Sequence, residues 1–495
     1  MRKPSYLAVL GTALLLATSL SPAFGAARTD ITVGMQLEPP NLDPTGSAAA
    51  AIDEVVYANV FEGLTRFDSS GAVQPALAES WDISEDGLEY TFHLHGGVTF
   101  HDGSAMDSAD VVFSYERAMA EDSTNAQKAL FADIASVRGV DATTVLITLS
   151  KPNGSFLSNT AWGDAVIVAP ETAADNATNP IGTGPFVFVD WAQGDHVELG
   201  KNPNYWGDPV ALDSVTFKFI SDATAAFAAM MAEDVDVFPV FPAPENLPQF
   251  EADPRFSVII GSTEGETILS TNNLAPNLTD VRVREAIAHA IDRQAIIDGA
   301  MFGYGTPIGT HFNPTNPDYI DLTGQSDYDP DKARALLAEA GVSDLTLRLK
   351  LPPPTYARRG GEIIAAQLRE VGINTEISNL EWAQWLEEVF KAHDYDLSIV
   401  SHTEPMDIGI YARDDYYFQY DNAEMQAIMA ELNDTTDPAG RTALLHKAQQ
   451  HIADEYVNGY LFQLAKTGVA NAKINGLWEN SPTQASDMTG VSWSE

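Results

Sequence analysis

The sequence has 495 residues and no cysteine, which excludes disulfides, thiolate metal sites, a cysteine nucleophile and a lipid-modified cysteine at a mature N-terminus. It has 70 acidic residues against 27 lysines and arginines and a formal net charge of −43, so nucleic acid and anionic membranes are disfavoured partners. Because this length exceeds what one hydrophobic core usually organises, we expect two or more lobes.

The first 25 residues have the pattern of a secretory signal peptide. Arg2 and Lys3 precede a short apolar run, and small residues follow at Ala23 and Gly25. We expect cleavage after Gly25 or, alternatively, after Ala27. No later stretch is long and apolar enough for a membrane helix. The sequence therefore predicts an exported, soluble protein without a lipid anchor.

Strands and helices are mixed along the rest of the chain. Alternating apolar residues predict strands at 89–95 and 215–219. Four helices are expected. The fourth in chain order runs from 362 to 371 and is ended by Gly372. Proline-rich stretches at 351–354 and 238–244 predict loops or hinges. The aspartates expected to begin the other three helices are Asp107 (with Asp110 in a capping box), Asp280 and Asp329.

The usual sequence markers of catalysis are absent. The sequence contains no nucleophile elbow, no zinc-protease motif and no phosphate-binding loop. Gly182 and Gly184 form a doublet, but Pro185 lacks the amide donor that a phosphate loop requires, so we expect a tight turn. A hydrolase is the alternative from a different functional class, and no motif supports it.

Three histidines lie close together in the sequence and could in principle bind a metal. His93 and His95 share one face of the strand at 89–95, and His101 follows a short turn. The opposite face carries the apolar residues, so we interpret the histidines as polar strand and turn residues. We expect no metal site and no cofactor.

A series of segments resembles the extracellular solute-binding proteins of peptide, nickel and oligosaccharide ABC importers. The strongest block reads Pro-Ala-Leu-Ala-Glu-Ser-Trp at 75–81, and the others follow in the order that the family has. The matching blocks are 75–81, 86–92, 97–103, 109–115, 180–186, 202–207, 280–292 and 328–337.

The resemblance implies an α/β fold of two lobes in the periplasmic binding protein class, with ligand between them. Two crossing strands would join the lobes near residues 270 and 467. The implied divisions are 1–25 signal peptide, 26–49 lobe I, 50–180 a subdomain inserted in lobe I, 181–270 lobe I, 271–467 lobe II and 468–495 lobe I.

The same resemblance implies where ligand binds. The family's amine-binding aspartate corresponds to Asp407, whose alternative role is a helix cap. Where dipeptide binders carry an arginine two residues before Tyr356, this chain has Pro354, although Arg358 or Arg359 could replace it as a carboxylate clamp. The expected ligand-binding residues are Asp407, Glu404, His402, Trp382, Tyr356, Trp162 and Tyr417.

The implied function is capture of a short peptide or peptide-like amine and its delivery to the permease subunits of an ABC importer in the inner membrane. The protein would act as a monomer in the periplasm, without catalysis. Within the same class, an oligosaccharide, an opine-like compound and a nickel chelate are alternative ligands.

Overall fold

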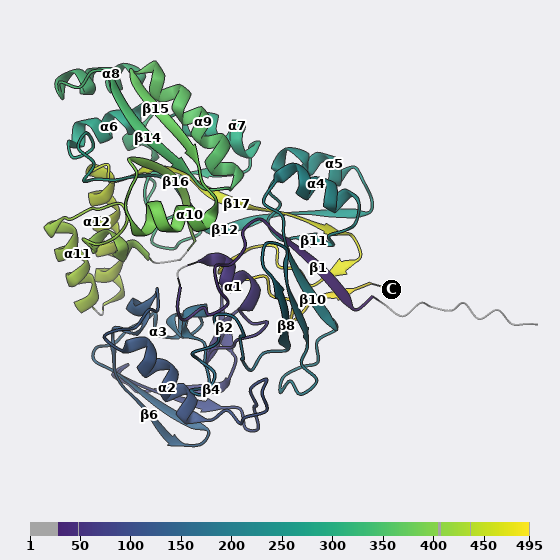
Figure 1. The fold of residues 1–495 in the computed structure, drawn as a ribbon. Coiled ribbons are helices and arrows are strands. Elements are labelled where there is room, and N and C mark those ends of the chain that lie inside the picture. The colour runs from purple at the N-terminus through teal and green to yellow at the C-terminus, as the bar shows by residue number, and fades with distance from the viewer. Residues whose placement is uncertain (1–27, 48, 404–406, 436, 495) are drawn as a thin grey trace, which may run out of the picture.

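The computed structural model describes residues 28–47, 49–403, 407–435 and 437–494 (Figure 1). The expected signal peptide lies outside these residues. Within them, no helix combines the length and apolar character needed to cross a membrane.

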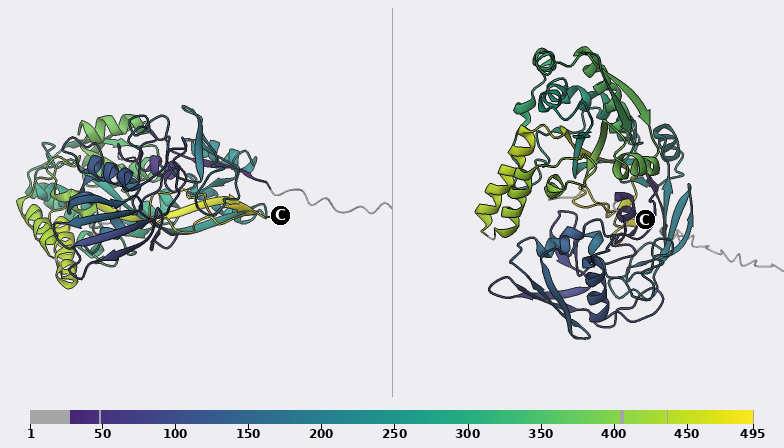
Figure 2. Two further views of the ribbon diagram at one scale, coloured as in Figure 1. Left: turned by 90° about the horizontal axis from the view of Figure 1, so that it is seen from below. Right: turned by 60° about the vertical axis from the view of Figure 1, so that its left-hand side comes forward.

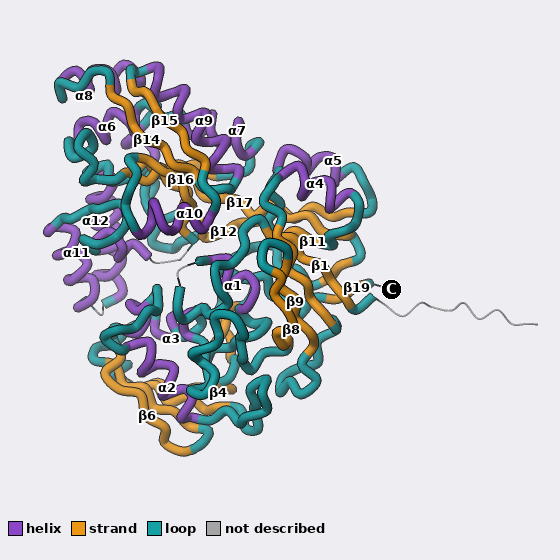
Figure 3. Tube along the Cα trace, viewed as in Figure 1, coloured by secondary structure: helices purple, strands orange, loops and turns teal. Residues whose placement is uncertain are grey.

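An 11-stranded mixed sheet extends through both lobes, outside the region that holds β4 to β7 (Figures 1 and 3). Its inner strands β12 and β17 are long and antiparallel, whereas β1 pairs with β10 and β14 with β15 in parallel. In spatial order the strands are β15 (Ile373–Asn379), β14 (Leu345–Leu351), β16 (Leu397–His402), β12 (Phe256–Thr271), β17 (Gly459–Asn471), β11 (Val237–Phe238), β1 (Asp30–Met35), β10 (Ser214–Phe219), β9 (His196–Lys201) and β8 (Phe186–Ala192), and β13 (Thr306–Pro307) pairs with β17.

A separate four-stranded sheet lies within the expected insert. Its strands in order are β4 (Ala78–Ile83), β5 (Glu89–Leu94), β7 (Thr144–Leu149) and β6 (Ile134–Asp141). Two short pairs complete the described strands: β2 (Thr65–Phe67) with β3 (Val73–Pro75), and β18 (Ile474–Asn475) with β19 (Ser492–Trp493). The strands expected at 89–95 and 215–219 are confirmed as β5 and β10.

Helix starts follow the capping residues that the sequence indicates. Asp107, Asp280 and Asp329 each accept a hydrogen bond from a backbone N–H in the first turn of the helix that follows. Asp107 and Asp110 form the expected capping box. The described α-helices are α1 (Ala50–Val56), α2 (Ser108–Met119), α3 (Phe156–Asn159), α4 (Ala223–Met231), α5 (Leu247–Glu251), α6 (Val281–His289), α7 (Arg293–Met301), α8 (Pro330–Glu339), α9 (Thr355–Glu370), α10 (Trp382–Trp385), α11 (Ala423–Asp434) and α12 (Pro438–Asp454).

The fourth expected helix ends as predicted, but its predicted start at Glu362 is wrong. Helix α9 begins at Thr355, directly after the proline run, because Pro354 is extended and cannot continue a helix backward. Gly361 belongs to the helix because it packs on β14: a Cβ atom there would lie 2.4 Å from Cδ1 of Leu351.

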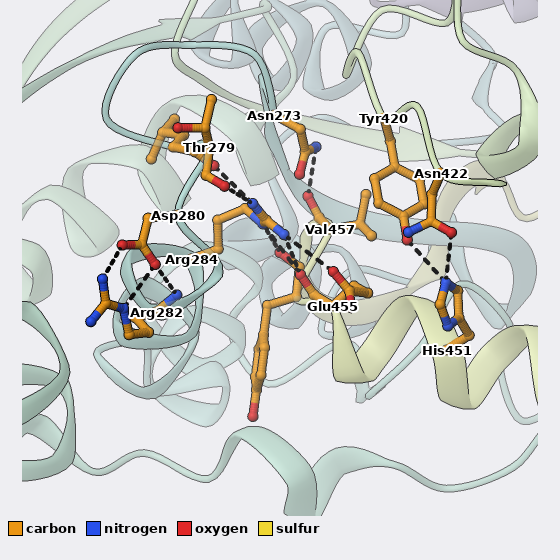
Figure 4. Close-up of polar contacts among 12 residues, drawn as sticks. Asn273, Thr279, Asp280, Arg282, Arg284, Tyr420, Asn422, His451, Glu455 and Val457 are labelled. Carbon is orange, nitrogen blue, oxygen red and sulfur yellow. Dashed lines mark hydrogen bonds and ion pairs between the residues drawn. The ribbon is translucent and has the colours of Figure 1, made fainter. Parts of the chain in front are cut away.

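The buried guanidinium of Arg284 connects helix α6 to the segment that follows α12 (Figure 4). Arg284 donates hydrogen bonds to the carbonyls of Leu278, Glu455 and Tyr456. Burial lowers the pKa of Arg284 below its usual value. These bonds fix two segments that are far apart in the sequence to one side of the upper lobe.

The glycine doublet at 182–184 is explained by close backbone packing. The amide of Gly184 donates to the carbonyl of Val60 at 2.9 Å. A Cβ atom on Gly182 would lie 2.0 Å from that same carbonyl oxygen, so a larger residue does not fit. The glycines therefore serve the packing of this bend against residues 59–60.

The molecule has two lobes (Figure 2), and strands β12 and β17 pass from one to the other (Figure 1). Their pairing is interrupted by a bulge between Ser262 and Glu266. Gly265 lies in this bulge, where a Cβ atom would come within 2.6 Å of Oγ of Ser401. The two long strands lie near the crossings expected at residues 270 and 467, and the exact domain boundaries stay a prediction.

Candidate functional site

A pocket with a volume of about 440 Å³ opens between the two lobes. One wall comes from the segment after β1, from the β8–β9 turn and from the end of β10. The other wall comes from the end of β14 and the start of α10. The lining residues are Gln36, Leu37, Glu38, Pro39, Pro40, Trp191, Gln193, Gly194, Phe219, Ser221, Pro353, Glu381, Trp382 and Ala383.

The pocket combines aromatic and acidic side chains from both lobes. Trp191 donates through Nε1 to Oε1 of Glu38 at 3.1 Å, which fixes both side chains of the first lobe. From the second lobe, Trp382 stacks on Trp385 with ring centroids 5.0 Å apart and planes at 3°. Glu381 adds a second carboxylate. Flat apolar surfaces with nearby carboxylates suit a ligand that has an apolar part and a hydrogen-bond-donating or cationic part.

A second group of polar side chains lies buried in the second lobe, where β16 ends beside β12. We call Glu266, His311, His402 and Asp407 the acid–histidine cluster. Nε2 of His311 lies 2.8 Å from Oδ1 of Asp407, and Nδ1 of His402 lies 3.3 Å from Oδ2 of Asp407. Glu266 is the register partner of His402 across the β12–β16 pair, so their side chains share one face of the sheet.

The histidines stabilise the charged form of Asp407. Burial alone would raise its pKa, but the charges and hydrogen bonds of His311 and His402 hold the pKa of Asp407 below its usual value. The pKa of Glu266 is shifted in the opposite direction. Burial, followed by the charges of Asp407 and Glu264, raises the pKa of Glu266 well above its usual value. The two carboxylates therefore differ in their readiness to hold a charge.

Two tyrosines hold the outer nitrogens of the imidazoles. The hydroxyl of Tyr411 is hydrogen-bonded to Nδ1 of His311 at 3.1 Å, and the hydroxyl of Tyr417 to Nε2 of His402 at 3.1 Å. The rings of His402 and Tyr417 are stacked at 6.0 Å. Both imidazoles are thus held with their other nitrogen toward Asp407.

Of the seven expected ligand-binding residues, the structure brings Asp407, His402 and Tyr417 together and places Trp382 in the pocket. The alternative role of Asp407 is that of a helix cap. In the structure, however, both of its carboxylate oxygens face imidazoles. Glu404 lies outside the described residues. The sequence analysis missed His311, which follows β13 in a loop and belongs to no motif that marks it.

The other expected residues have mainly packing contacts. The hydroxyl of Tyr356 accepts a hydrogen bond from the amide of Ser401 at 3.2 Å, joining α9 to β16, and burial raises the pKa of Tyr356 to about 12. Trp162 is buried in the first lobe, edge-on to Phe67 with ring centroids 6.2 Å apart. Neither side chain lines the pocket described above.

The two candidate clamp arginines both have partners within the protein. Arg358 donates to the carbonyl of Leu380 at 3.1 Å and pairs with Glu381 at the pocket edge. Arg359 forms an ion pair with Glu245 from the other lobe. Arg358 is therefore the one that lies next to a pocket residue.

The clustered histidines near residue 100 also have protein partners. Nε2 of His93 lies 2.9 Å from a carboxylate oxygen of Asp82. His95 packs on Trp206, and Nε2 of His101 lies 2.9 Å from the carbonyl oxygen of Gly184. They point to separate partners rather than to a common centre.

Comparison with known proteins places this arrangement in a family. The model of the bacterial extracellular solute-binding proteins, family 5, matches residues 72–424. The chain belongs to this family. This solute-binding protein is 32% identical to glutathione-binding protein GsiB of Pectobacterium atrosepticum over 74% of its own chain and 72% of that protein. It is 30% identical to di/tripeptide-binding protein 4 of Pseudomonas aeruginosa over 88% of its own chain and 90% of that protein.

Solved structures show the same fold. The Escherichia coli murein tripeptide binding protein MppA superposes with a TM-score of 0.88 at 20% identity, over 94% of this solute-binding protein and 99% of that chain. The expected two-lobed α/β fold is therefore confirmed. The family consists of extracellular binding proteins, and this chain shares that class.

Proposed function

We propose that this solute-binding protein captures a short peptide or peptide-like amine and delivers it to the permease of an ABC importer. The observation that carries the proposal is the pocket whose walls come from both lobes, with Trp191 and Glu38 on one side and Trp382 and Glu381 on the other. Relatives named for glutathione and for di- and tripeptides support this ligand class.

Binding between two lobes supplies the signal for delivery. A ligand that touches both walls stabilises the arrangement in which they are close, and it shifts the population of lobe arrangements by its preference for that one. No bond in the ligand has to break. The permease subunits of the inner membrane would recognise the closed, loaded form.

We further propose that the protein acts as a free monomer in the periplasm. The pattern of residues 1–25 supports export, and the absence of cysteine from the sequence argues against a lipid-modified N-terminus. Intact-mass analysis of exported protein tests the cleavage after Gly25 or Ala27, and light scattering tests the monomer.

Mass spectrometry of the molecules that co-purify with the exported protein identifies the ligand directly. We expect a short peptide or related amine, bound at one equivalent and released unchanged. Titration calorimetry with the synthetic compound then gives the affinity. Recovery of an oligosaccharide, an opine-like compound or a nickel chelate instead would refute the peptide assignment, and turnover of the added compound would show a hydrolase.

A further inference from the structure

The acid–histidine cluster has a geometry that the pocket and the proposed ligand do not explain. One nitrogen of His311, one nitrogen of His402 and one oxygen of Asp407 all lie within 4.8 Å of one another. All three side chains are almost fully buried, with 0%, 7% and 8% of their surface exposed. We propose that these three residues form a binding site for one divalent transition-metal ion, with the Glu266 carboxylate beside it.

The ligand types and spacing fit such an ion. Zinc binds histidine nitrogens and carboxylate oxygens at about 2.0–2.2 Å, so neighbouring ligand atoms of a tetrahedral site are about 3.4 Å apart. The two nitrogen–oxygen distances to Asp407 are 2.8 Å and 3.3 Å. Small movements of the three side chains bring all ligand atoms to the required spacing.

The surroundings of the histidines are those of metal ligands. Each imidazole has its outer nitrogen hydrogen-bonded to a tyrosine hydroxyl, Tyr411 for His311 and Tyr417 for His402. Such outer contacts fix the orientation of the ring, and an outer nitrogen that donates to the tyrosine oxygen leaves the lone pair of the inner nitrogen to the ion. In His311 the inner nitrogen is Nε2, and in His402 it is Nδ1.

Glu266 provides a second observation in favour of a metal ion, independent of the spacing of the three ligand residues. Its side chain is 2% exposed, and Oε1 accepts a hydrogen bond from Nδ2 of Asn313 at 2.8 Å. Oε2 has no hydrogen-bond partner among the described residues. A buried carboxylate oxygen without a partner is costly, and a cation next to it removes that cost. Strand register places Glu266 on the same face as His402, and the charge of Asp407 acts on the Glu266 carboxylate, so this carboxylate lies near the proposed ion.

Charge balance favours a divalent cation over a plain hydrogen-bonded cluster. When both histidines are neutral and Glu266 is ionised, the charges of Asp407 and Glu266 together neutralise one divalent ion. A cluster without metal provides partners for Asp407 through the imidazoles but leaves Oε2 of Glu266 without one. Imidazole and carboxylate ligands together suit zinc, nickel, copper and cobalt more than magnesium or calcium.

The test uses the exported protein, stripped with EDTA and then dialysed against zinc chloride, with bound zinc measured by mass spectrometry. We expect one equivalent of zinc, and binding weaker by more than about 100-fold in His311→Ala and His402→Ala. Tyr417→Phe should weaken binding by about 10- to 100-fold through the outer contact. The matched control is His93→Ala, which removes an imidazole that faces a single carboxylate, Asp82, and should bind zinc as the wild type does.

Cobalt binding tests the metal site in the wild-type protein alone, so the result does not depend on whether the variants fold. Cobalt chloride added to the stripped wild-type protein should produce visible absorption bands of a four- or five-coordinate site with nitrogen and oxygen ligands, and zinc should remove them. Absence of bound zinc and of these bands in the wild type, or equal zinc binding in His402→Ala, would overturn the proposal. The residues that line the pocket are different ones, so loss of zinc binding in His402→Ala with unchanged affinity for the co-purified compound separates this proposal from the peptide assignment.

Discussion

Nε2 of His311 lies 2.8 Å from Oδ1 of Asp407, and both side chains are buried. The carboxylate for which a cationic ligand partner is expected from the sequence thus already has partners within the protein. This pairing gives Asp407 a role in stability that is separable from any role in ligand binding.

We expect Asp407→Asn to lower the free energy of unfolding by about 1–3 kcal/mol, because one acceptor oxygen becomes an amide donor that faces an imidazole. Urea unfolding in EDTA, which removes metal, measures this. Asp82→Asn is the control, since Asp82 pairs with His93 on the surface and should change stability by less than about 0.5 kcal/mol. Unchanged unfolding together with a large loss of affinity for the identified ligand would instead support the amine-binding role of Asp407.

The pocket tryptophans should affect ligand binding. We expect Trp382→Ala and Trp191→Ala each to weaken ligand affinity by about 1 kcal/mol or more, roughly fivefold, because each removes an aromatic wall from one lobe. Calorimetric titration with the co-purified compound measures the change. Trp81→Ala is the matched control: Trp81 is also partly buried and packs on Phe92, away from the pocket. Equal affinities in all three variants would show that the ligand binds elsewhere.

The buried Glu62 explains why two of the sequence blocks that resemble the family come together. Its carboxylate accepts hydrogen bonds from Oγ1 of Thr183, the hydroxyl of Tyr205 and Nε1 of Trp206, each at 2.8 Å. We expect Glu62→Gln to cost about 1–3 kcal/mol of stability, because the new amide group faces a donor. Thermal unfolding compares it with Glu85→Gln at an exposed site, which should match the wild type. A neutral effect of Glu62→Gln would contradict this network.

Features set by neighbouring residues could be predicted from the sequence. The caps Asp107, Asp280 and Asp329 bond to backbone amides two or three residues away, so the local pattern was sufficient. The start of α9 was not predictable in this way, because the position of Gly361 in the helix depends on its contact with Leu351 of another element.

The acid–histidine cluster could be predicted from the sequence only in part. Asp407 and His402 are near each other in the chain, and resemblance to the family identified them. His311 and Asp407 are 96 residues apart, and Glu266 reaches His402 only through the register of β12 with β16. No spacing rule links residues whose proximity is created by the pairing of distant strands and a loop. The residues that line the pocket come from five separate segments for the same reason.

A half-buried acid in α1, Glu54, and a buried lysine in β17, Lys466, give the last prediction. Burial raises the pKa of Glu54 to about 7 from 4.5, although the charge of Lys466 opposes the shift. Burial lowers the pKa of Lys466 to about 8 from 10.5, with Glu54 opposing, and Nζ of Lys466 donates to the carbonyl of Trp478 at 2.6 Å. Each group thus holds its charge less readily in the folded protein than in the unfolded chain.

The two shifts have opposite effects on how stability changes with pH. Between pH 4.5 and about 7 the folded protein holds the proton of Glu54 more tightly than the unfolded chain does, so Glu54 makes stability fall as the pH rises. Between about 8 and 10.5 the unfolded chain binds the proton of Lys466 more tightly, so Lys466 makes stability rise with pH. Together they place a minimum of their joint contribution between pH 7 and 8.

Glu54→Gln keeps the shape of the side chain and removes its titration. We expect the variant to lose the Glu54 part of the decline between about pH 5 and pH 7, so that its stability relative to the wild type improves by about 1–3 kcal/mol over that interval. Urea unfolding at closely spaced pH values measures the difference, which cancels the titration of other carboxylates. Glu85→Gln, at an exposed site, should run parallel to the wild type. A difference between Glu54→Gln and wild type that stays constant from about pH 5 to about pH 8 would show that Glu54 titrates in the folded protein as it does in the unfolded chain.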